Sequence, residues 1–268
     1  MAFSLGQLRD ANRAAARGWT PEQEEQTFQD LAARYAATAL ESRTEEDIAN
    51  FRRWLDMDVK VSGKTGGRAL DLGAGEGRST QRLRELGFDA IGVERSPVVA
   101  ARAPEGLVIV GDAQDIPVED ASMDLVICNS LVEHVLDPDR VLRELRRVLT
   151  PGGVCILHTT NRMHWQTGEI NFPIFQWLPA RVRAIIWHMS GRTHISPHYF
   201  TYSGLTKRAE AVGFRVTSPL TVRGTVQHGG WKGLLVRLAY GTPVGRFALC
   251  VRFGVVELHL WAPDGTRR

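Results

Sequence analysis

Residues 69–80 read ALDLGAGEGRST, and this glycine-rich stretch is the clearest structural signal in the sequence. Gly73, Gly75 and Gly77 alternate with other residues after a short apolar run that carries one acid, Asp71. A glycine-rich turn between a strand and a helix lets a ligand approach the backbone, because no Cβ atom intervenes. The stretch therefore predicts a strand, a ligand-binding turn and a helix, in that order.

The residues that follow continue this pattern as alternating strands and helices. Helix 78–87 is expected to end at Gly87, and helix 96–103 to begin with Ser96 as its N-cap and Pro97 in its first turn. Apolar runs predict strands at 68–73, 89–94, 106–111, 123–130 and 154–160, with a long amphipathic helix over 137–153. Short connections repeated in this order predict an α/β fold, with a parallel sheet covered on both faces.

The flanking segments differ from this central part. Residues 1–65 are polar and helical in pattern, and we expect them to form an N-terminal helical cap that ends in the loop 62–67. Its second helix, 45–57, is expected to turn Ile48, Phe51 and Leu55 inward, with Trp54 as a further candidate. After Asn161 the pattern lapses until a helix at 202–214 and a strand at 214–222. Residues 253–262 alternate apolar and polar side chains, which predicts a half-buried antiparallel strand that closes the sheet.

Composition sets limits on the partners. Hydrophobic residues make up 43% of the chain, the formal net charge is only +3, and the arginines are scattered, so a nucleic-acid-binding arm is not expected. The three cysteines, Cys128, Cys155 and Cys250, are widely spaced in apolar runs and are expected to be buried thiols. We recognise neither a signal peptide nor a run of about 18 apolar residues, so the expectation is a cytoplasmic protein without stable membrane insertion.

Two classes of ligand use a turn of this kind. A dinucleotide is bound by GxGxxG, but here the third glycine comes one residue early and Arg78 takes the sixth position. Asp71 also opposes a pyrophosphate, because two negative groups repel. S-adenosylmethionine, which carries an ammonium group and a sulfonium centre, suits a carboxylate at this place. Asp71 would then supply the complementary charge or brace the loop.

Two further acids follow strands where an adenosine group would need them. Glu94 ends the second strand, where a carboxylate can accept hydrogen bonds from both ribose hydroxyls; the alternative is a solvated charge. Asp112 follows the third strand and can accept from the adenine amino group, while the amide of Ala113 faces a ring nitrogen. The alternative for Asp112 is an Asx-turn or an N-cap, and both roles are compatible.

On these residues the chain resembles the class I S-adenosylmethionine-dependent methyltransferases, and it is most similar to the branch of the ubiquinone and menaquinone biosynthesis methyltransferases. The motifs that carry the resemblance are ALDLGAGEGRST, IGVERS and the stretch from GDAQDIP through LVEHVLDPD to LTPGGVCIL, over about residues 66–160. The segment YSGLTKRAEAVGFRV extends it, and FQDLAARY resembles the N-terminal segment of this branch. The second strand ends in Glu where the family more often has Asp, which keeps the carboxylate.

This resemblance implies the fold and the site. The fold would be a doubly wound, mostly parallel seven-stranded sheet (Rossmann-like), with the domain over 66–268 and a lid insertion over 161–202. The cofactor would be S-adenosyl-L-methionine. The family positions that would contact it correspond to Tyr35, Asp71, Gly73, Ala74, Gly75, Gly77, Glu94, Arg95, Asp112, Ala113, Asn129 and Ser130.

Methyl transfer requires alignment and the exclusion of water, and a hydroxyl nucleophile also needs a base. His134 in NSLVEHVLDPD lies just past the fourth strand, at the edge where such clefts open, and is the candidate catalytic residue. The alternative is a histidine that pins this loop or caps the next helix. Glu133 beside it is expected to be structural.

The stretch 161–202 is rich in aromatic residues and histidines, and we expect it to lie over the cleft. The candidate substrate contacts are Trp165, His194, His198 and Tyr199, with Phe172, Phe175, Trp177 and Trp187 as further rings that either line the pocket or pack the insertion onto the sheet. His194 and His198 have a spacing that metal ligands use, but Pro197 interrupts a helix there and acidic partners are lacking, so no metal is expected.

The leading hypothesis is therefore an enzyme that methylates a small, apolar or aromatic molecule, at oxygen. Methylation of carbon on a quinone-like or polyketide ring is the near alternative, and a nicotinamide dehydrogenase and a non-catalytic cofactor-binding protein are further ones. Residues 129–132 read NSLV in place of the proline-rich aromatic tetrad of base methyltransferases, which argues against nucleic acid as a partner. The amphipathic segment 231–240 is a candidate homodimer interface or lipid contact, with core packing as the alternative.

Overall fold

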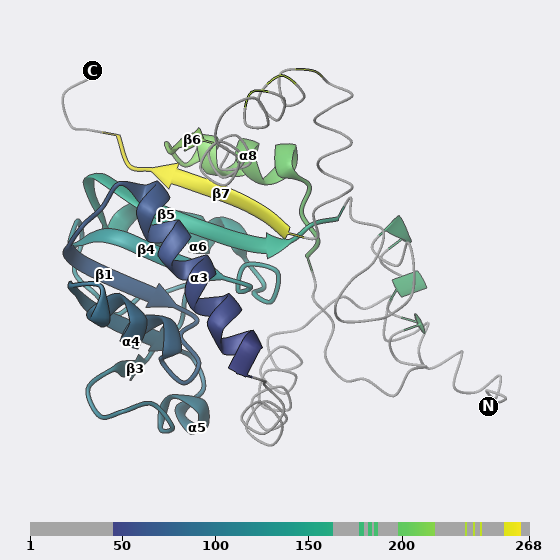
Figure 1. Ribbon diagram of the computed structural model, residues 1–268. Coiled ribbons are helices and arrows are strands. Elements are labelled where there is room, and N and C mark those ends of the chain that lie inside the picture. The colour runs from purple at the N-terminus through teal and green to yellow at the C-terminus, as the bar shows by residue number, and fades with distance from the viewer. Residues whose placement is uncertain are drawn as a thin grey trace, which may run out of the picture.

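The computed structural model describes residues 45–162, 177–179, 182–183, 185–186, 198–217 and 255–263, and the single residues 234, 238 and 242. Their strands form one seven-stranded sheet in the order β3-β2-β1-β4-β5-β7-β6 (Figure 1). The parallel strands are β1 (Gly67–Leu72), β2 (Phe88–Glu94), β3 (Val108–Val110), β4 (Met123–Asn129) and β5 (Leu149–Thr160). β7 (Val255–Trp261) is antiparallel to both of its neighbours, β5 and β6 (Arg215–Thr217).

The order of the strands reverses between β1 and β4. The chain adds β2 and β3 on one side of β1 and then returns to add β4 and β5 on the other side. In an open parallel sheet, ligands bind outside the carboxyl ends of the strands at such a switch point. The expected α/β fold with a doubly wound, mostly parallel sheet of seven strands is confirmed.

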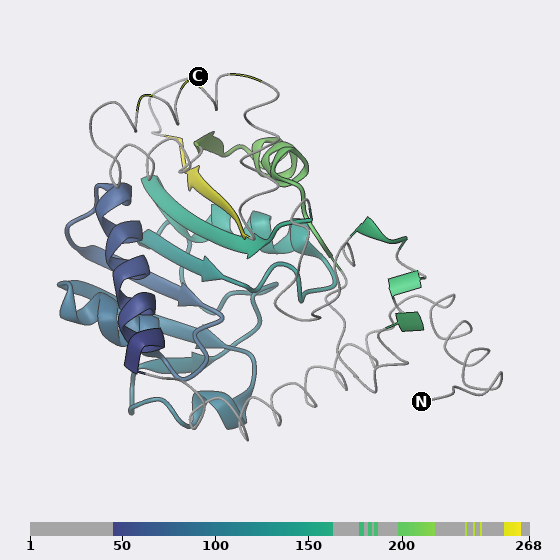
Figure 2. The ribbon, with the colours of Figure 1, turned by 45° about the vertical axis from the view of Figure 1, so that its right-hand side comes forward.

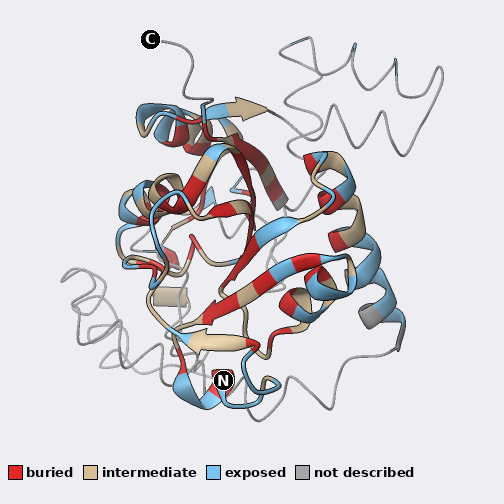
Figure 3. Ribbon diagram, turned by 90° about the vertical axis from the view of Figure 1, so that its left-hand side faces the viewer, coloured by how far each residue is buried: buried red, intermediate tan, exposed pale blue. Residues whose placement is uncertain are grey.

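Helices cover both faces of the sheet (Figures 1 and 2). The helices are α3 (Glu45–Ser62), α4 (Arg78–Glu85), α5 (Pro97–Ala100), α6 (Pro138–Val148) and α8 (Tyr202–Ala211). Alternate residues of the central strands enter two separate cores. Leu125 and Ile127 pack with Leu55 of α3, whereas Val126 packs with Leu142 of α6. Figure 3 shows the buried residues concentrated in the strands and on the inner sides of these helices.

Two of the local signals for helix ends are confirmed. Ser96 caps α5 by accepting from the amide of Val99 at 3.4 Å, and Pro97 occupies the first turn. Gly87 follows α4 with φ +92°, the left-handed backbone that glycine allows at a helix end. Helix α3 extends five residues beyond the predicted end at residue 57, up to the predicted loop at 62. The helix predicted over 137–153 was too long: α6 ends at Val148, because Leu149 pairs with Met123 and already belongs to β5.

The inner side of α3 was predicted in part. Leu55 is buried as expected and Phe51 is half-buried, whereas Trp54 is 49% exposed and does not enter the core. The side chain of Ile48 lies outside the described residues.

The C-terminal strand departs from its predicted place. β7 was expected to close the sheet, but it lies between β5 and β6, so β6 forms the edge. Val256, Leu258 and Leu260 are buried as predicted, and His259 on the opposite face is buried too. The strand therefore has buried residues on both faces instead of being half-buried.

Cys128 and Cys155 are buried free thiols, as expected, and burial raises the pKa of both. Cys250, most of the expected lid and the segment 231–240 apart from residues 234 and 238 lie outside the described residues. Within the ranges given above, no helix has the length and apolar character needed to cross a membrane.

A close contact between β2 and the glycine turn gives a testable constraint. A Cβ atom at Gly92 would lie 2.6 Å from the Cβ of Ala74 and 2.7 Å from Oγ1 of Thr80. We expect Gly92→Ala to lower the free energy of unfolding by about 1–3 kcal/mol, since one of these groups must shift. Urea unfolding measures the effect, with Gly66→Ala as the control, because a Cβ there meets only the Gly87 carbonyl at 3.6 Å. Equal losses in the two variants would contradict the constraint.

Candidate functional site

The turn between β1 and α4 is fixed to β2 on one side and open on the other. The amides of Gly73 and Ala74 both donate to the carbonyl of Val93, at 2.9 and 3.0 Å. A Cβ at Gly77 would lie 2.8 Å from Cδ2 of Leu107, whereas a Cβ at Gly75 would meet no atom within 4 Å. Gly75 also has φ +55°, so the turn exposes bare backbone at the point where a ligand has room.

Asp71 braces this turn. Its side chain is buried, and its Oδ2 accepts a hydrogen bond from Oγ1 of Thr80 at 2.8 Å, which links the end of β1 to the first turn of α4. Burial raises the pKa of Asp71 to about 6, and the hydrogen bond from Thr80 opposes that rise. Of the two roles predicted for Asp71, bracing is the one that this contact provides.

Glu94 at the tip of β2 is held by two backbone amides. Its Oε2 accepts from the amide of Gly75 at 3.0 Å, and its Oε1 accepts from the amide of Ser96 at 2.9 Å. The carboxylate is therefore fixed beside the open side of the turn and is not a freely solvated charge. An ionised carboxylate has about four acceptor sites, so two hydrogen bonds leave capacity for hydroxyl donors.

Asp112 follows β3 and forms the Asx-turn that was one of its predicted roles. Its Oδ1 accepts from the amide of Gln114 at 2.8 Å, and its Oδ2 lies 4.0 Å from Nε of Arg95. Ala113 beside it is buried. Asp71 and Glu94 thus lie at the carboxyl ends of β1 and β2, and Asp112 follows β3, so the three acidic residues lie along one edge of the sheet.

The tip of β4 carries an unusual backbone conformation. Asn129 ends the strand and is exposed, and Ser130 after it has φ +50°, which non-glycine residues rarely adopt. The amide of Ser130 donates to the carbonyl of His158 at 2.9 Å, so this turn is tied to β5. Such strained positions are often retained at functional sites.

The loop that carries His134 is anchored by its neighbours. Glu133 is buried and accepts from Oγ1 of Thr159 at 2.7 Å and from the amide of Thr160 at 3.2 Å, in keeping with its expected structural role. The ring Nε2 of His198 lies 3.2 Å from the carbonyl of Leu136, and burial lowers the pKa of His198. These contacts hold the loop in place, while His134 itself is half-buried.

The other predicted substrate contacts are not brought together. Tyr199 is buried, and the guanidinium of Arg183 lies 4.8 Å from its ring centre. Neither Tyr199 nor His198 lines the pocket described next. Tyr35, Trp165 and His194 lie outside the described residues, as do the other expected aromatic residues of the lid except Trp177, which is exposed.

A pocket of about 270 Å³ lies between α3 and the tips of β4 and β5. It is lined by Asn50, Phe51, Trp54, Leu55 and Asp58 of α3, Ser79 of α4, Ile127 and Asn129 of β4, and His158 of β5. Of these residues only Asn129 was predicted to belong to a site. The lining residues of α3 are spaced about one helical turn apart, so they lie on one face of the helix. Asn50 and Asp58 are the polar residues on this face, and their spacing could have indicated a site from the sequence.

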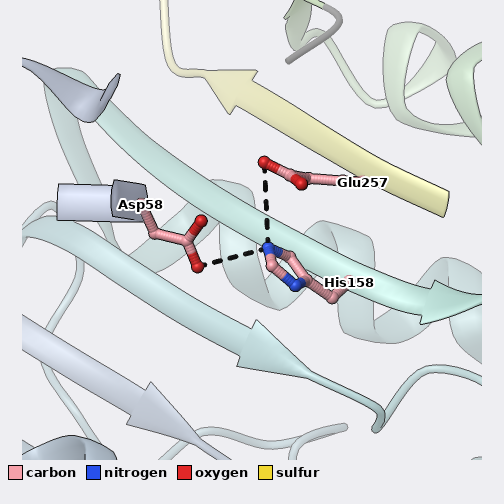
Figure 4. Close-up of side chains that lie close together, drawn as sticks. All are labelled: Asp58, His158 and Glu257. Carbon is pink, nitrogen blue, oxygen red and sulfur yellow. Dashed lines mark ion pairs between the residues drawn. The ribbon is translucent and has the colours of Figure 1, made fainter. Parts of the chain in front are cut away.

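Three polar residues from distant parts of the chain converge under this pocket (Figure 4). Nε2 of His158 lies 3.3 Å from Oδ2 of Asp58 and 4.0 Å from Oε1 of Glu257. Asp58 and His158 are each 4% exposed. Nε2 of His259 approaches the same Oε1 of Glu257 at 3.3 Å, so two carboxylates and two imidazoles form one buried group.

Comparison with known proteins agrees with this geometry. The family model described as "Methyltransferase domain" matches residues 70–157. An uncharacterised methyltransferase of Mycobacterium tuberculosis (strain H37Rv) is 42% identical over 171 residues, which cover 58% of this chain and 68% of the relative. The demethylmenaquinone methyltransferase of Renibacterium salmoninarum is 30% identical over 197 residues, 70% of this chain and 78% of that protein.

The fold is shared with solved structures at low identity. A crystal structure of an S-adenosylmethionine-dependent methyltransferase from Mesorhizobium loti superposes with a TM-score of 0.52 and 18% identity, over 77% of this chain and 99% of that chain. At this level of identity the likeness concerns the fold alone.

The buried carboxyl of Asp71 leads to a prediction of pH-dependent stability. With a folded-state pKa of about 6 against an ordinary 3.8, the folded protein retains a proton between these values that the unfolded chain has lost. Stability therefore falls as the pH rises through this window, and above it the ionised group carries the full cost. Asp71→Asn keeps an acceptor for Thr80 and removes the charge, so we expect it to raise the free energy of unfolding at pH 8 by up to about 3 kcal/mol.

Chemical unfolding of the ligand-free protein at pH 4, 6 and 8 tests this expectation. The gain should shrink towards pH 4, where the folded wild type is protonated at this position and close to half of the unfolded chains are protonated there too. Asp89→Asn is the control, since Asp89 is exposed on β2. A gain for Asp71→Asn that is independent of pH would contradict the assignment.

Proposed function

Because the chain belongs to the class I S-adenosylmethionine-dependent methyltransferases, we propose that it transfers a methyl group to an oxygen atom of a small molecule bound between α3 and the tips of β4 and β5. S-adenosylmethionine is its cofactor, and when bound it supplies an electrophilic methyl group on a sulfonium centre. The residues of this chain position the two reactants and exclude water between them.

The cofactor is assigned to the edge formed by the tips of β1, β2 and β3. Glu94, fixed by the amides of Gly75 and Ser96, would accept from the ribose hydroxyls. Asp112 and Ala113 would meet the adenine, with Arg95 beside the ribose. The turn residues Gly73, Ala74, Gly75 and Gly77, braced by Asp71, would hold the methionine end together with Asn129 and Ser130, and Tyr35 keeps the contact that the resemblance implies. The open space at Gly75 supports this assignment, because a side chain there would occupy it.

The pocket next to this edge is assigned to the methyl acceptor. The observation that carries the proposal is that Asn129 lines the pocket and is also an expected cofactor residue, so the two sites adjoin at the tip of β4. Phe51, Trp54, Leu55 and Ile127 give the pocket an apolar wall, which suits an apolar or aromatic molecule. Its volume of about 270 Å³ suits a small acceptor.

Part of this wall comes from the segment proposed as an N-terminal cap. Helix α3 supplies five of the nine lining residues. The cap over residues 1–65 would therefore complete the acceptor site of the domain over 66–268, and the lid over 161–202, with Trp165, His194, His198 and Tyr199, would cover it.

His134 is proposed as the general base that takes the proton from the acceptor hydroxyl. It lies in the loop after β4. Glu133 holds this loop against β5 through Thr159, and His198 contacts the loop at the carbonyls of Glu133 and Leu136. An imidazole titrates near neutral pH and so suits proton transfer under physiological conditions.

Cofactor binding tests the first part of the proposal. Isothermal calorimetry with S-adenosylmethionine and with S-adenosylhomocysteine should detect both, and binding of neither would reject the function. Glu94→Gln should weaken binding at least tenfold, or about 1.4 kcal/mol, since the amide accepts ribose hydrogen bonds less well than the carboxylate. Glu105→Gln, at an exposed position in the connection before β3, is the matched control and should bind like the wild type.

Turnover tests the acceptor and the base. With a donor that carries a trideuterated methyl group and a panel of hydroxylated aromatic compounds, we expect products heavier by one labelled methyl group, attached at oxygen. His134→Ala should lower kcat by roughly 100-fold or more while the cofactor Kd stays unchanged. Label attached to ring carbon would reassign the acceptor atom, and unchanged turnover would remove His134 as the base.

A further inference from the structure

We propose that Asp58, His158 and Glu257 form a binding site for one divalent transition-metal cation at the floor of the acceptor pocket. The site itself is independent of the proposed function, whereas its use toward the acceptor rests on that function. The three residues come from α3, β5 and β7, and each is about 100 residues from the next in sequence.

The donor atoms already have the spacing of a ligand set. One nitrogen and two oxygens all lie within 4.8 Å of one another, with Nε2 of His158 at 3.3 and 4.0 Å from the two carboxylate oxygens. Metal bonds of roughly 2.1 Å place neighbouring ligand atoms roughly 3–3.5 Å apart. Small side-chain adjustments therefore suffice to bring all three atoms to bonding distance of one cation.

The supporting elements make this arrangement rigid. His158 and Glu257 are directly paired across β5 and β7, so they lie on the same face of two interior strands. Asp58 is held against this face by Leu55 and Val59, which belong to the core beneath α3. A bidentate pair of Asp56 with Arg82, at 2.8 and 2.9 Å, fastens the same part of α3 to α4. Ligands on packed elements of this kind are pre-organised.

Charge balance favours a cation at this place. Two buried carboxylates are costly unless their charge is compensated, and an imidazole compensates only while it is protonated. A divalent cation compensates both carboxylates and leaves His158 as a neutral ligand. Two oxygens and one imidazole nitrogen suit Zn²⁺, Mn²⁺ or Fe²⁺ better than Ca²⁺ or Mg²⁺, which prefer oxygen alone.

His259 has the position of a supporting residue. Its Nε2 lies 3.3 Å from Oε1 of Glu257, and its ring is almost completely buried. Residues that hydrogen-bond to a ligand in this way orient it and contribute to metal affinity. The cluster thus contains three ligands and one partner that fixes the third ligand.

The open side of the site faces the pocket. Asp58 and His158 both line it, together with Asn129. A cation with three protein ligands keeps further coordination positions, which here open toward the pocket. On the proposed function, an oxygen donor of the methyl acceptor would occupy such a position.

Direct metal binding tests the site without the need for an acceptor. Full-length protein is stripped with a chelator, dialysed and titrated with ZnSO₄ and with MnCl₂ by calorimetry, and metal content is measured by mass spectrometry. We expect one equivalent bound by the wild type. His158→Gln and Glu257→Gln should lose more than tenfold in affinity, and His259→Gln roughly tenfold. Glu46→Gln, which alters an exposed acid of α3, should match the wild type.

Two outcomes would overturn the site: a wild type that binds less than half an equivalent, or a His158→Gln variant that binds as tightly as the Glu46→Gln control. Asp58→Asn provides a further ligand variant if one of the others does not fold. Calorimetry with S-adenosylhomocysteine is run on every variant, both as a check of folding and to separate the two proposals. A wild type that binds S-adenosylhomocysteine but no metal removes only the metal site, and a wild type that binds the metal but no S-adenosylhomocysteine removes only the proposed function.

Discussion

The turn between β1 and α4 must lie against β2, and the rest of the site depends on this contact. One carbonyl, that of Val93, accepts the amides of both Gly73 and Ala74, and Gly92 provides the space beneath them. With the turn in this position, the amide of Gly75 reaches the carboxylate of Glu94. This one backbone contact thereby fixes both the glycine turn and the acid at the tip of the next strand. Such prior positioning lowers the cost of ordering the site when a ligand binds.

Helix α3 links this edge to the pocket that is proposed for the methyl acceptor. It forms one wall of the pocket, and its Asp56 is paired with Arg82 of α4, the helix that begins at the glycine turn. The pocket wall formed by α3 and the glycine turn before α4 are thus joined through this ion pair between the two helices. The same helix places Asp58 beside His158, so α3 contributes both apolar side chains and a buried acid to the pocket. The core beneath α3 fixes both, since Leu55 and Val59 pack on the sheet.

Local patterns in the sequence predicted much of the fold and part of the site. The apolar runs and the glycine turn identified the five parallel strands, and Ser96 and Gly87 marked helix ends, because these signals depend on neighbours in the chain. The prediction that β7 closes the sheet was wrong, because strand order depends on contacts between segments that are distant in sequence. The grouping of Asp58, His158 and Glu257 was missed for the same reason: each looks like an isolated polar residue, and only packing of α3, β5 and β7 unites them.

The position of β7 has a consequence for the order in which the protein is completed on the ribosome. β7 follows β6 in sequence yet lies between β5 and β6, so β5 has a bare edge and β6 has no strand partner until residues 255–261 have been synthesised. Exposed edges of this kind invite pairing with other chains. Until those residues are available, the nascent polypeptide exposes strand edges of β5 and β6 that are paired in the folded protein.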